Sequence, residues 1–240
     1  MTDRYLIVNA DDFGQSPGVN RGIIQSHEEG IVTSASLMVR WPAAAEATGY
    51  GSQRPQLSLG LHLDLGEWAF RNDAWESVYE VAPLTNTTAV KEELWRQLAE
   101  FRRLTGKPPT HIDSHQHVHT REAVQPLVAE MVRSLGVPLR GCDPRVRYSG
   151  EFYGQTADGQ PLDHLIGVDA LSAVLRDLPP GVTELGCHPG IGNDLNTMYS
   201  RERAREVETL CDPRIRAVLA SHGIRLCSFA EIDQVGTWPA

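Results

Sequence analysis

The 240-residue sequence predicts an α/β protein built around a parallel sheet of about seven strands. Short apolar runs alternate along the chain with longer helix-like runs, which is typical of parallel strands joined by helical crossovers. Several apolar runs are followed directly by Asp or His, and the carboxyl ends of parallel strands form the active-site edge of such folds. Periodicity alone leaves a closed barrel and an open doubly wound sheet as alternatives.

The first strand is expected where residues 5–8 form an apolar run that stops at polar Asn9, as in a buried parallel strand. No G-x-G-x-x-G or G-x-x-x-x-G-K sequence follows it, so a phosphate-binding loop is not indicated. The strands are then expected over residues 5–8, 32–39, 57–65, 111–119 (a strand with its exit loop), 137–140, 183–187 and 224–228.

The helices are expected between these strands, and turn residues set their ends. Pro17 suits a helix start, Asn86 or Thr88 can cap the longest helix, and Pro213 breaks the last helical region. The helices are then expected over residues 17–30, 43–48, 86–105, 121–135, 169–178 and 201–222. Residues 66–85 and 141–168 have no clear period, and three aromatic residues make 66–85 an ordered loop that is a candidate lid.

Composition excludes several classes of protein. The net charge of −9 disfavours a nucleic-acid binder, which needs clustered Lys and Arg. No apolar run approaches the roughly 18 residues of a membrane span, and no export signal is recognisable, so we expect a cytoplasmic protein without a membrane partner. The four cysteines form no C-x-x-C pair, which indicates reduced thiols rather than a zinc knuckle or a redox dithiol.

Four segments place acidic or histidine side chains at strand ends, and together they predict a catalytic edge. Asp11 and Asp12 follow the first strand, where one carboxylate can bind a metal and the other a water; alternatively, one caps the next helix and the other is solvated. The segments are 9–14, 60–64, 111–119 and 187–190.

Residues 111–119 hold four of the nine histidines, and on a strand His111, Asp113, His115, His117 and His119 would share one face. We therefore expect at least one metal ligand among them. A lone histidine such as His62 or His188 has a structural alternative, as a hydrogen-bonded core or turn residue. One Asp with two His is typical of a catalytic divalent metal, and the inventory favours metal-assisted amide hydrolysis over nucleophilic catalysis, since no G-x-S-x-G occurs.

These segments resemble the YdjC-like carbohydrate deacetylase family, which includes chitooligosaccharide deacetylases. The similarity runs from residue 4 to about residue 229, and is carried by residues 6–14, 30–34, 60–62, 109–119 and 187–189. It implies one domain over residues 1–240 with an irregular (β/α) barrel, similar to a TIM barrel. It also implies a hydrolase with one divalent metal ion, Zn or Mg, that removes N-acetyl groups from N-acetylglucosamine-containing oligosaccharides or related amino sugars. A homodimer follows from family analogy alone.

The resemblance also implies roles for individual residues. Asp12, His62 and His115 would hold the metal, Asp11 would be the general base, and His188 would be the general acid or an oxyanion partner. Asp113 would orient a metal ligand, and His117 would line the pocket or bind substrate. His119 is left without a role.

Two other functions share part of this inventory. A metallo-amidohydrolase or phosphoesterase acting on a non-sugar would use the same ligands, although no Arg/Lys cluster near the motifs favours phosphate esters. A catalytically silent sugar-binding protein would keep the pocket, and Trp41, Trp68 and Trp75 would stack on sugar rings in either case. The presence of Asp11, the residue expected to act as the base, argues against a catalytically silent protein.

Overall fold

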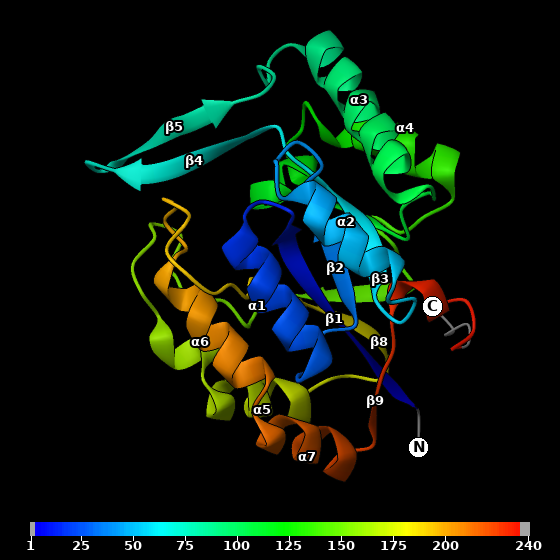
Figure 1. The fold of residues 1–240 in the computed structure, drawn as a ribbon, viewed down its shortest axis with the longest axis vertical. Helices are drawn as coiled ribbons and strands as arrows, with labels where there is room; N and C mark the ends of the chain where they lie inside the picture. The colour runs from blue at the N-terminus through cyan, green and yellow to red at the C-terminus, as the bar shows by residue number, and fades with distance from the viewer. Residues whose placement is uncertain (1–2, 236–240) are drawn as a thin grey trace.

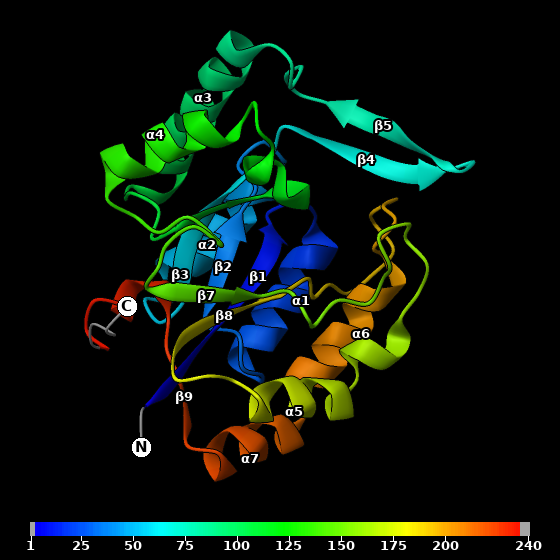
Figure 2. The same cartoon turned by 180° about the vertical axis from the view of Figure 1, so that it is seen from behind.

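A curled parallel sheet forms the centre of the molecule, and helices flank it (Figures 1 and 2). The computed structural model describes residues 3–235. The strands lie in the order β6-β3-β2-β1-β8-β7, β9 pairs with the first residues of β1, and every pair is parallel. They are β1 (Arg4–Phe13), β2 (Ser34–Leu37), β3 (Ser58–Leu63), β6 (Ile112–Ser114), β7 (Val146–Ser149), β8 (Gly181–Cys187) and β9 (Ile224–Leu226). The predicted α/β fold with a TIM-barrel-like parallel sheet is confirmed, and the sheet is a half-barrel.

Neighbouring helices contact one another in the order α7, α5, α6, α1, α2, α3, α4, an arc that follows the strand order. The helices are α1 (Pro17–Glu28), α2 (Ala44–Ser52), α3 (Thr87–Thr105), α4 (Gln125–Leu135), α5 (Val168–Arg176), α6 (Arg201–Leu210) and α7 (Pro213–Ser221). Asn86, one of the two predicted caps, caps α3, and the predicted break near Pro213 separates α6 from α7, which Asp212 caps. Within residues 3–235, no helix is both long and apolar enough to span a membrane.

The central strand β1 separates the core from the polar site by its alternation. Leu6, Val8 and Ala10 belong to the large apolar cluster that also contains residues of α1, while Ile7 packs into a second cluster with Val146 and Phe229. Beyond Ile7, the same face of the strand carries Asn9 and then Asp11. The strand therefore leads from an apolar base to buried polar side chains at its carboxyl end.

The prediction that the first strand stops at Asn9 is wrong, because β1 continues to Phe13. The side-chain NH2 group of Asn9 is buried within the strand and has three acceptors in hydrogen-bond range: Ser36 Oγ, Asp11 Oδ1 and Asp113 Oδ2. These hydrogen bonds offset the cost of burying the polar side chain of Asn9. The polar residue at this position therefore indicates a buried hydrogen-bond network and not the end of the strand.

The segment 66–85 is not a loop but mainly a β-hairpin, which projects from the body of the molecule (Figure 1). Its antiparallel strands are β4 (Gly66–Arg71) and β5 (Ala74–Glu80). Asn72 and Asp73 form the tip with φ values of 51° and 60°. Both belong to the residue types that tolerate the positive φ of a tight two-residue hairpin turn.

Two other expectations about strands are wrong. Residues 137–140 contribute only one isolated bridge, between Leu139 and Ile112, while the stretch 141–168 contains the edge strand β7. The histidine-rich segment forms a strand only over β6 and then turns into a short 3-10 helix, η1 (His115–Thr120), in which Gln116 and His117 are left-handed. The expected alternation of His111 to His119 on one strand face therefore does not exist.

Candidate active site

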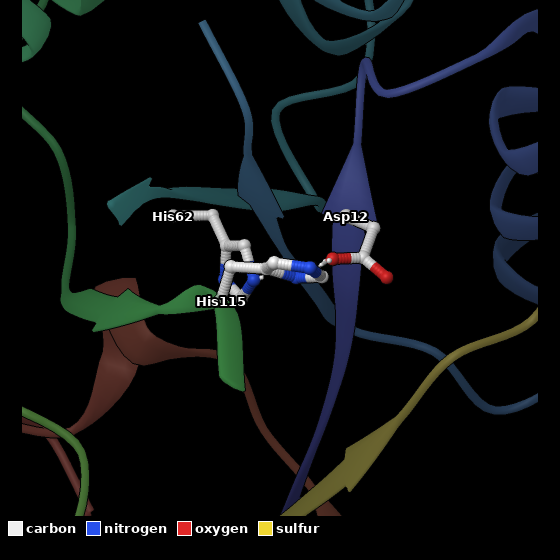
Figure 3. Close-up of side chains that lie close together, drawn as sticks. All are labelled: Asp12, His62 and His115. Carbon is white, nitrogen blue, oxygen red and sulfur yellow. Dashed lines mark hydrogen bonds and ion pairs between the residues drawn. The ribbon is translucent and has the colours of Figure 1, made fainter. Parts of the chain in front are cut away.

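Asp12, His62 and His115 come together at the carboxyl ends of three strands (Figure 3). Asp12 Oδ1 lies 3.3 Å from His62 Nε2 and 3.0 Å from His115 Nδ1. Ligand atoms about 2.0–2.2 Å from one metal ion are themselves about 3.0–3.5 Å apart, so the spacing fits a single ion. Two imidazoles and one carboxylate form a donor set suited to a divalent metal.

Backbone conformation explains how two adjacent aspartates reach the same pocket. Side chains of successive strand residues point to opposite faces, but Asp12 has a φ of 67° and the β1–β2 register shifts between Ala10 and Phe13. The left-handed turn at Asp12 brings both carboxylates into the pocket lining. The alternative in which one of them caps α1 is wrong, because Ser16 is the cap.

The second oxygen of Asp12 is held by a residue that the sequence did not single out. Arg203, on α6, donates from Nη2 to Asp12 Oδ2 at 2.6 Å. Burial would raise the pKa of Asp12, but Arg203 and His115 outweigh it and hold the pKa well below its ordinary value. Asp12 is therefore ionised, as a metal ligand must be.

Asp11 is held by a buried arginine that sequence reasoning also missed. Arg140 donates to both carboxylate oxygens of Asp11 at 2.6 Å, and it also contacts Asp113 at 2.8 Å and Glu184 at 2.7 Å. Burial would raise the pKa of Asp11, but Arg140 lowers it below the ordinary value. The only sequence signal for Arg140 is its place at the end of the apolar run 137–139.

Asp113 fixes the orientation of His62. Its Oδ1 lies 2.7 Å from His62 Nδ1, and its Oδ2 accepts hydrogen bonds from Ser36 Oγ and Arg140. A carboxylate behind one imidazole nitrogen directs the other nitrogen forward, here Nε2 toward Asp12. Burial would lower the pKa of His62, but Asp113 and Asp12 raise it to about 10.

His188 stands at the end of β8 on the far side of Asp11, with Nε2 3.7 Å from Asp11 Oδ2. Its ring packs edge-on to Tyr153 and beside Tyr199. Its backbone N–H donates to Glu206, whose other oxygen accepts from the Tyr199 hydroxyl. Burial lowers the pKa of His188 to about 4, so the imidazole is neutral near pH 7.

The remaining histidines of residues 111–119 have separate environments. His111 is a core residue stacked on Phe229, and His119 is buried between Ser114 Oγ and the carbonyl of Arg140. His117 lines the pocket, with Nε2 3.4 Å from the Tyr148 hydroxyl. Of these histidines, His115 belongs to the cluster with Asp12 and His62, here called the metal-type cluster, while His117 lies in the pocket wall.

The pocket above these residues has a volume of about 840 Å³. Aromatic residues from separate segments form part of its walls: Trp68 and Trp75 belong to the hairpin, and Tyr153 and Tyr199 lie in the segments after β7 and before α6. Trp41 is not among the lining residues, because its indole N–H donates to Asp64 at the base of the hairpin. The walls therefore offer flat apolar surfaces around a polar floor.

Comparison with known proteins places the chain in a family. The model of the YdjC-like protein family matches residues 5–221. A chitooligosaccharide deacetylase of Serratia marcescens is 31% identical over 96% of this chain and 100% of its own length. A carbohydrate deacetylase of Geobacillus stearothermophilus is 32% identical over 95% of this chain and 98% of its own length.

Solved structures share the fold. A putative cellobiose-phosphate cleavage protein from Enterococcus faecalis superposes with a TM-score of 0.77 at 24% identity, covering 96% of this chain and 99% of that chain. A family 4 carbohydrate esterase from Streptomyces lividans, solved with acetate, has a TM-score of 0.57 at 14% identity, covering 95% and 93%. The resemblance predicted from the sequence motifs is confirmed, and the chain belongs to the YdjC-like family.

Proposed function

We propose that this protein is a metal-dependent deacetylase that removes N-acetyl groups from N-acetylglucosamine-containing oligosaccharides or related amino sugars. The observation that carries the proposal is the placement of Asp11 beside the Asp12, His62 and His115 cluster, on the floor of one pocket. The names of the curated relatives, which are carbohydrate and chitooligosaccharide deacetylases, support the substrate class.

In this proposal Asp12, His62 and His115 hold one divalent ion. Two imidazole nitrogens favour Zn by ligand softness, and Mg is the alternative. When bound, such an ion supplies Lewis-acid chemistry: it polarises the amide carbonyl and makes a nearby water more acidic. Asp113 keeps His62 in the orientation that the cluster needs.

Asp11 acts as the general base. It faces the pocket, it is not one of the three ligands, and Arg140 keeps it ionised and fixed in place. Its carboxylate accepts a proton from the water that adds to the carbonyl carbon of the acetamide. Arg140 is a positioning residue, since it acts on the reaction through Asp11.

His188 acts as the general acid, with oxyanion stabilisation as the alternative role. It stands across Asp11 from the cluster residues and lines the same pocket. As the C–N bond breaks, the amine nitrogen takes a proton that His188 delivers, and the products are acetate and the free amino sugar. Because the resting imidazole is neutral, the proton that His188 delivers is the one that Asp11 accepted from the water and passed to His188 Nε2.

Aromatic walls suit a sugar ring. Trp68, Trp75 and Tyr153 present flat apolar faces at the pocket, and the apolar face of a pyranose ring stacks on such surfaces. Trp75 lines the pocket and is 52% exposed, so the surface of its ring is available to a bound ligand.

The test is acetate release from diacetylchitobiose by the purified protein, as isolated, after chelation, and after adding back Zn or Mg. Metal-restored release is the expected result. Tight metal binding without release from any N-acetyl sugar would favour a metallo-amidohydrolase or phosphoesterase acting on a non-sugar. If the protein shows no metal binding and no acetate release, the ligand assignment is overturned and the silent sugar-binding protein is favoured.

A further inference from the structure

Glu67 is a buried carboxylate that the proposed mechanism does not use. It lies at the start of strand β4, lines the pocket, and is 5% exposed. Its Oε2 lies 3.8 Å from His115 Nε2, and the His115 side chain is 11% exposed. Within residues 3–235, His115 Nε2 is a buried nitrogen without a hydrogen-bond partner. Glu67 thus places a carboxylate oxygen close to a buried imidazole nitrogen that lacks a partner.

Each imidazole of the Asp12, His62 and His115 cluster has a carboxylate behind it, at 2.7 Å for His62 and at 3.8 Å for His115. His62 faces Asp12 with Nε2 and has the Asp113 carboxylate behind Nδ1. His115 faces Asp12 with Nδ1 and has the Glu67 carboxylate behind Nε2. A carboxylate behind a metal-binding imidazole fixes its tautomer and raises its basicity. By this comparison, Glu67 stands to His115 as Asp113 stands to His62.

The sequence places Glu67 there through the hairpin rather than through the sheet. The β4–β5 ladder pairs Glu67 with Tyr79 and Trp68 with Ser77, so Val78 is an extra residue on β5. Such a bulge increases the local twist and re-aims the side chains around it. The register break therefore falls at the position that contacts the cluster.

Two sets of hydrogen bonds hold this end of the hairpin in place. The Gln116 side chain donates to the carbonyl of Trp68 at 2.8 Å and accepts from the Trp68 N–H at 2.9 Å. Asp64 accepts hydrogen bonds from the Gly66 N–H and from the Tyr79 hydroxyl. Gln116 directly follows His115 in the chain. The residue that binds the hairpin is therefore the neighbour of the histidine that Glu67 faces.

The geometry points to Glu67 as the residue that positions His115. Through Glu67, the β4–β5 hairpin contributes to the geometry of the proposed metal centre. This inference rests on the proposed metal-dependent function. As the ion-pair neighbour of Nε2, the Glu67 carboxylate favours a proton on that nitrogen and thereby leaves Nδ1 of His115 free for the metal. The same strand carries Trp68, so one hairpin orients a ligand and forms a wall of the substrate pocket.

The test compares Glu67→Gln with the control Glu76→Gln, which removes an equal charge from an exposed position on β5 of the same hairpin. Zn affinity is measured by competition with a chromophoric chelator, and the visible spectrum is recorded with Co as a probe of ligand geometry. We expect E67Q to weaken Zn binding about 10–100-fold and to alter the Co spectrum. We expect E76Q to match the wild type in both measurements.

Circular dichroism and thermal unfolding of the metal-free proteins show whether E67Q retains the fold. A folded E67Q that binds Zn within twofold of the wild type, with an unchanged Co spectrum, would overturn the role of Glu67 and leave the proposed function intact. A wild-type protein that binds neither metal would overturn the proposed metal centre itself, and the role of Glu67 with it.

Discussion

Arg140 holds both carboxylate oxygens of Asp11 at 2.6 Å, although the two residues lie 129 positions apart in the chain. The pair is buried, and Arg140 also contacts Asp113, the partner of His62. One guanidinium therefore joins the proposed base to the residue that orients a proposed metal ligand. The position of Asp11 therefore depends on contacts that join strands β1, β6 and β8 through Arg140.

The first prediction distinguishes the proposed general base, Asp11, from the proposed metal ligand, Asp12. Asp11→Asn keeps the shape of the side chain but cannot accept the proton from water, so kcat should fall by about 10²–10⁴-fold. Metal content should stay at the wild-type level, because Asp11 is not one of the three proposed ligands and both of its carboxylate oxygens accept hydrogen bonds from Arg140. Acetate release and bound metal are measured on the same preparation. Joint loss of metal and activity would show that Asp11 and Asp12 do not have the separate roles proposed for them.

The second prediction concerns stability at Arg140. Arg140→Met leaves Asp11, Asp113 and Glu184 as buried carboxylates without their shared cation. Breaking a buried ion pair by removing one partner costs about 3–5 kcal/mol, and we expect a loss of that size in the free energy of unfolding in urea. The control is Arg214→Met, at a solvent-exposed ion pair with Asp212, which should leave the free energy of unfolding nearly unchanged. Equal effects of the two substitutions would contradict the prediction.

Much of the site could be predicted from sequence because its residues follow short apolar runs. Asp12, His62 and His115 each lie at or near the end of a strand, and parallel strand ends meet at one edge of a sheet. Their clustering, and the parallel half-barrel, follow from that pattern and from the family motifs.

Other features depend on information that a local pattern does not contain. Arg140 follows a run that forms only one bridge, and its three carboxylate partners meet it only because the sheet curls. The alternation expected over residues 111–119 fails because Gln116 and His117 are left-handed, which ends the strand after Ser114. Asn72-Asp73 was the missed local signal for the hairpin, since both residues tolerate a positive φ.

The third prediction follows from Glu206, which lies behind His188. Burial raises the pKa of Glu206 from 4.5 to about 8, although Tyr199 and the His188 N–H lower it in part. Between pH 4.5 and 8 the unfolded chain releases this proton while the folded protein keeps it. Glu206 therefore makes the free energy of unfolding fall as pH rises, by at most about 1.4 kcal/mol per pH unit.

Glu206→Gln removes this titration, so the stability of the wild type relative to E206Q should decrease steadily from pH 5 to pH 8. Urea unfolding of both metal-free proteins across this range measures the difference, and metal-free samples exclude the pH dependence of metal binding. Parallel stability curves would mean that Glu206 has the same pKa in the folded and unfolded states.

The fourth prediction concerns the aromatic wall. Trp75 packs edge-on to Phe70 within the hairpin but keeps half of its surface exposed at the pocket, so its removal should spare the fold. If its indole stacks on a sugar ring, Trp75→Ala should raise KM for diacetylchitobiose about tenfold, a loss of about 1.4 kcal/mol, with little change in kcat. Trp75→Phe retains a flat ring and should restore most of the affinity. Steady-state acetate release gives both constants, and a fall in kcat with unchanged KM would place Trp75 in the chemistry rather than in sugar binding.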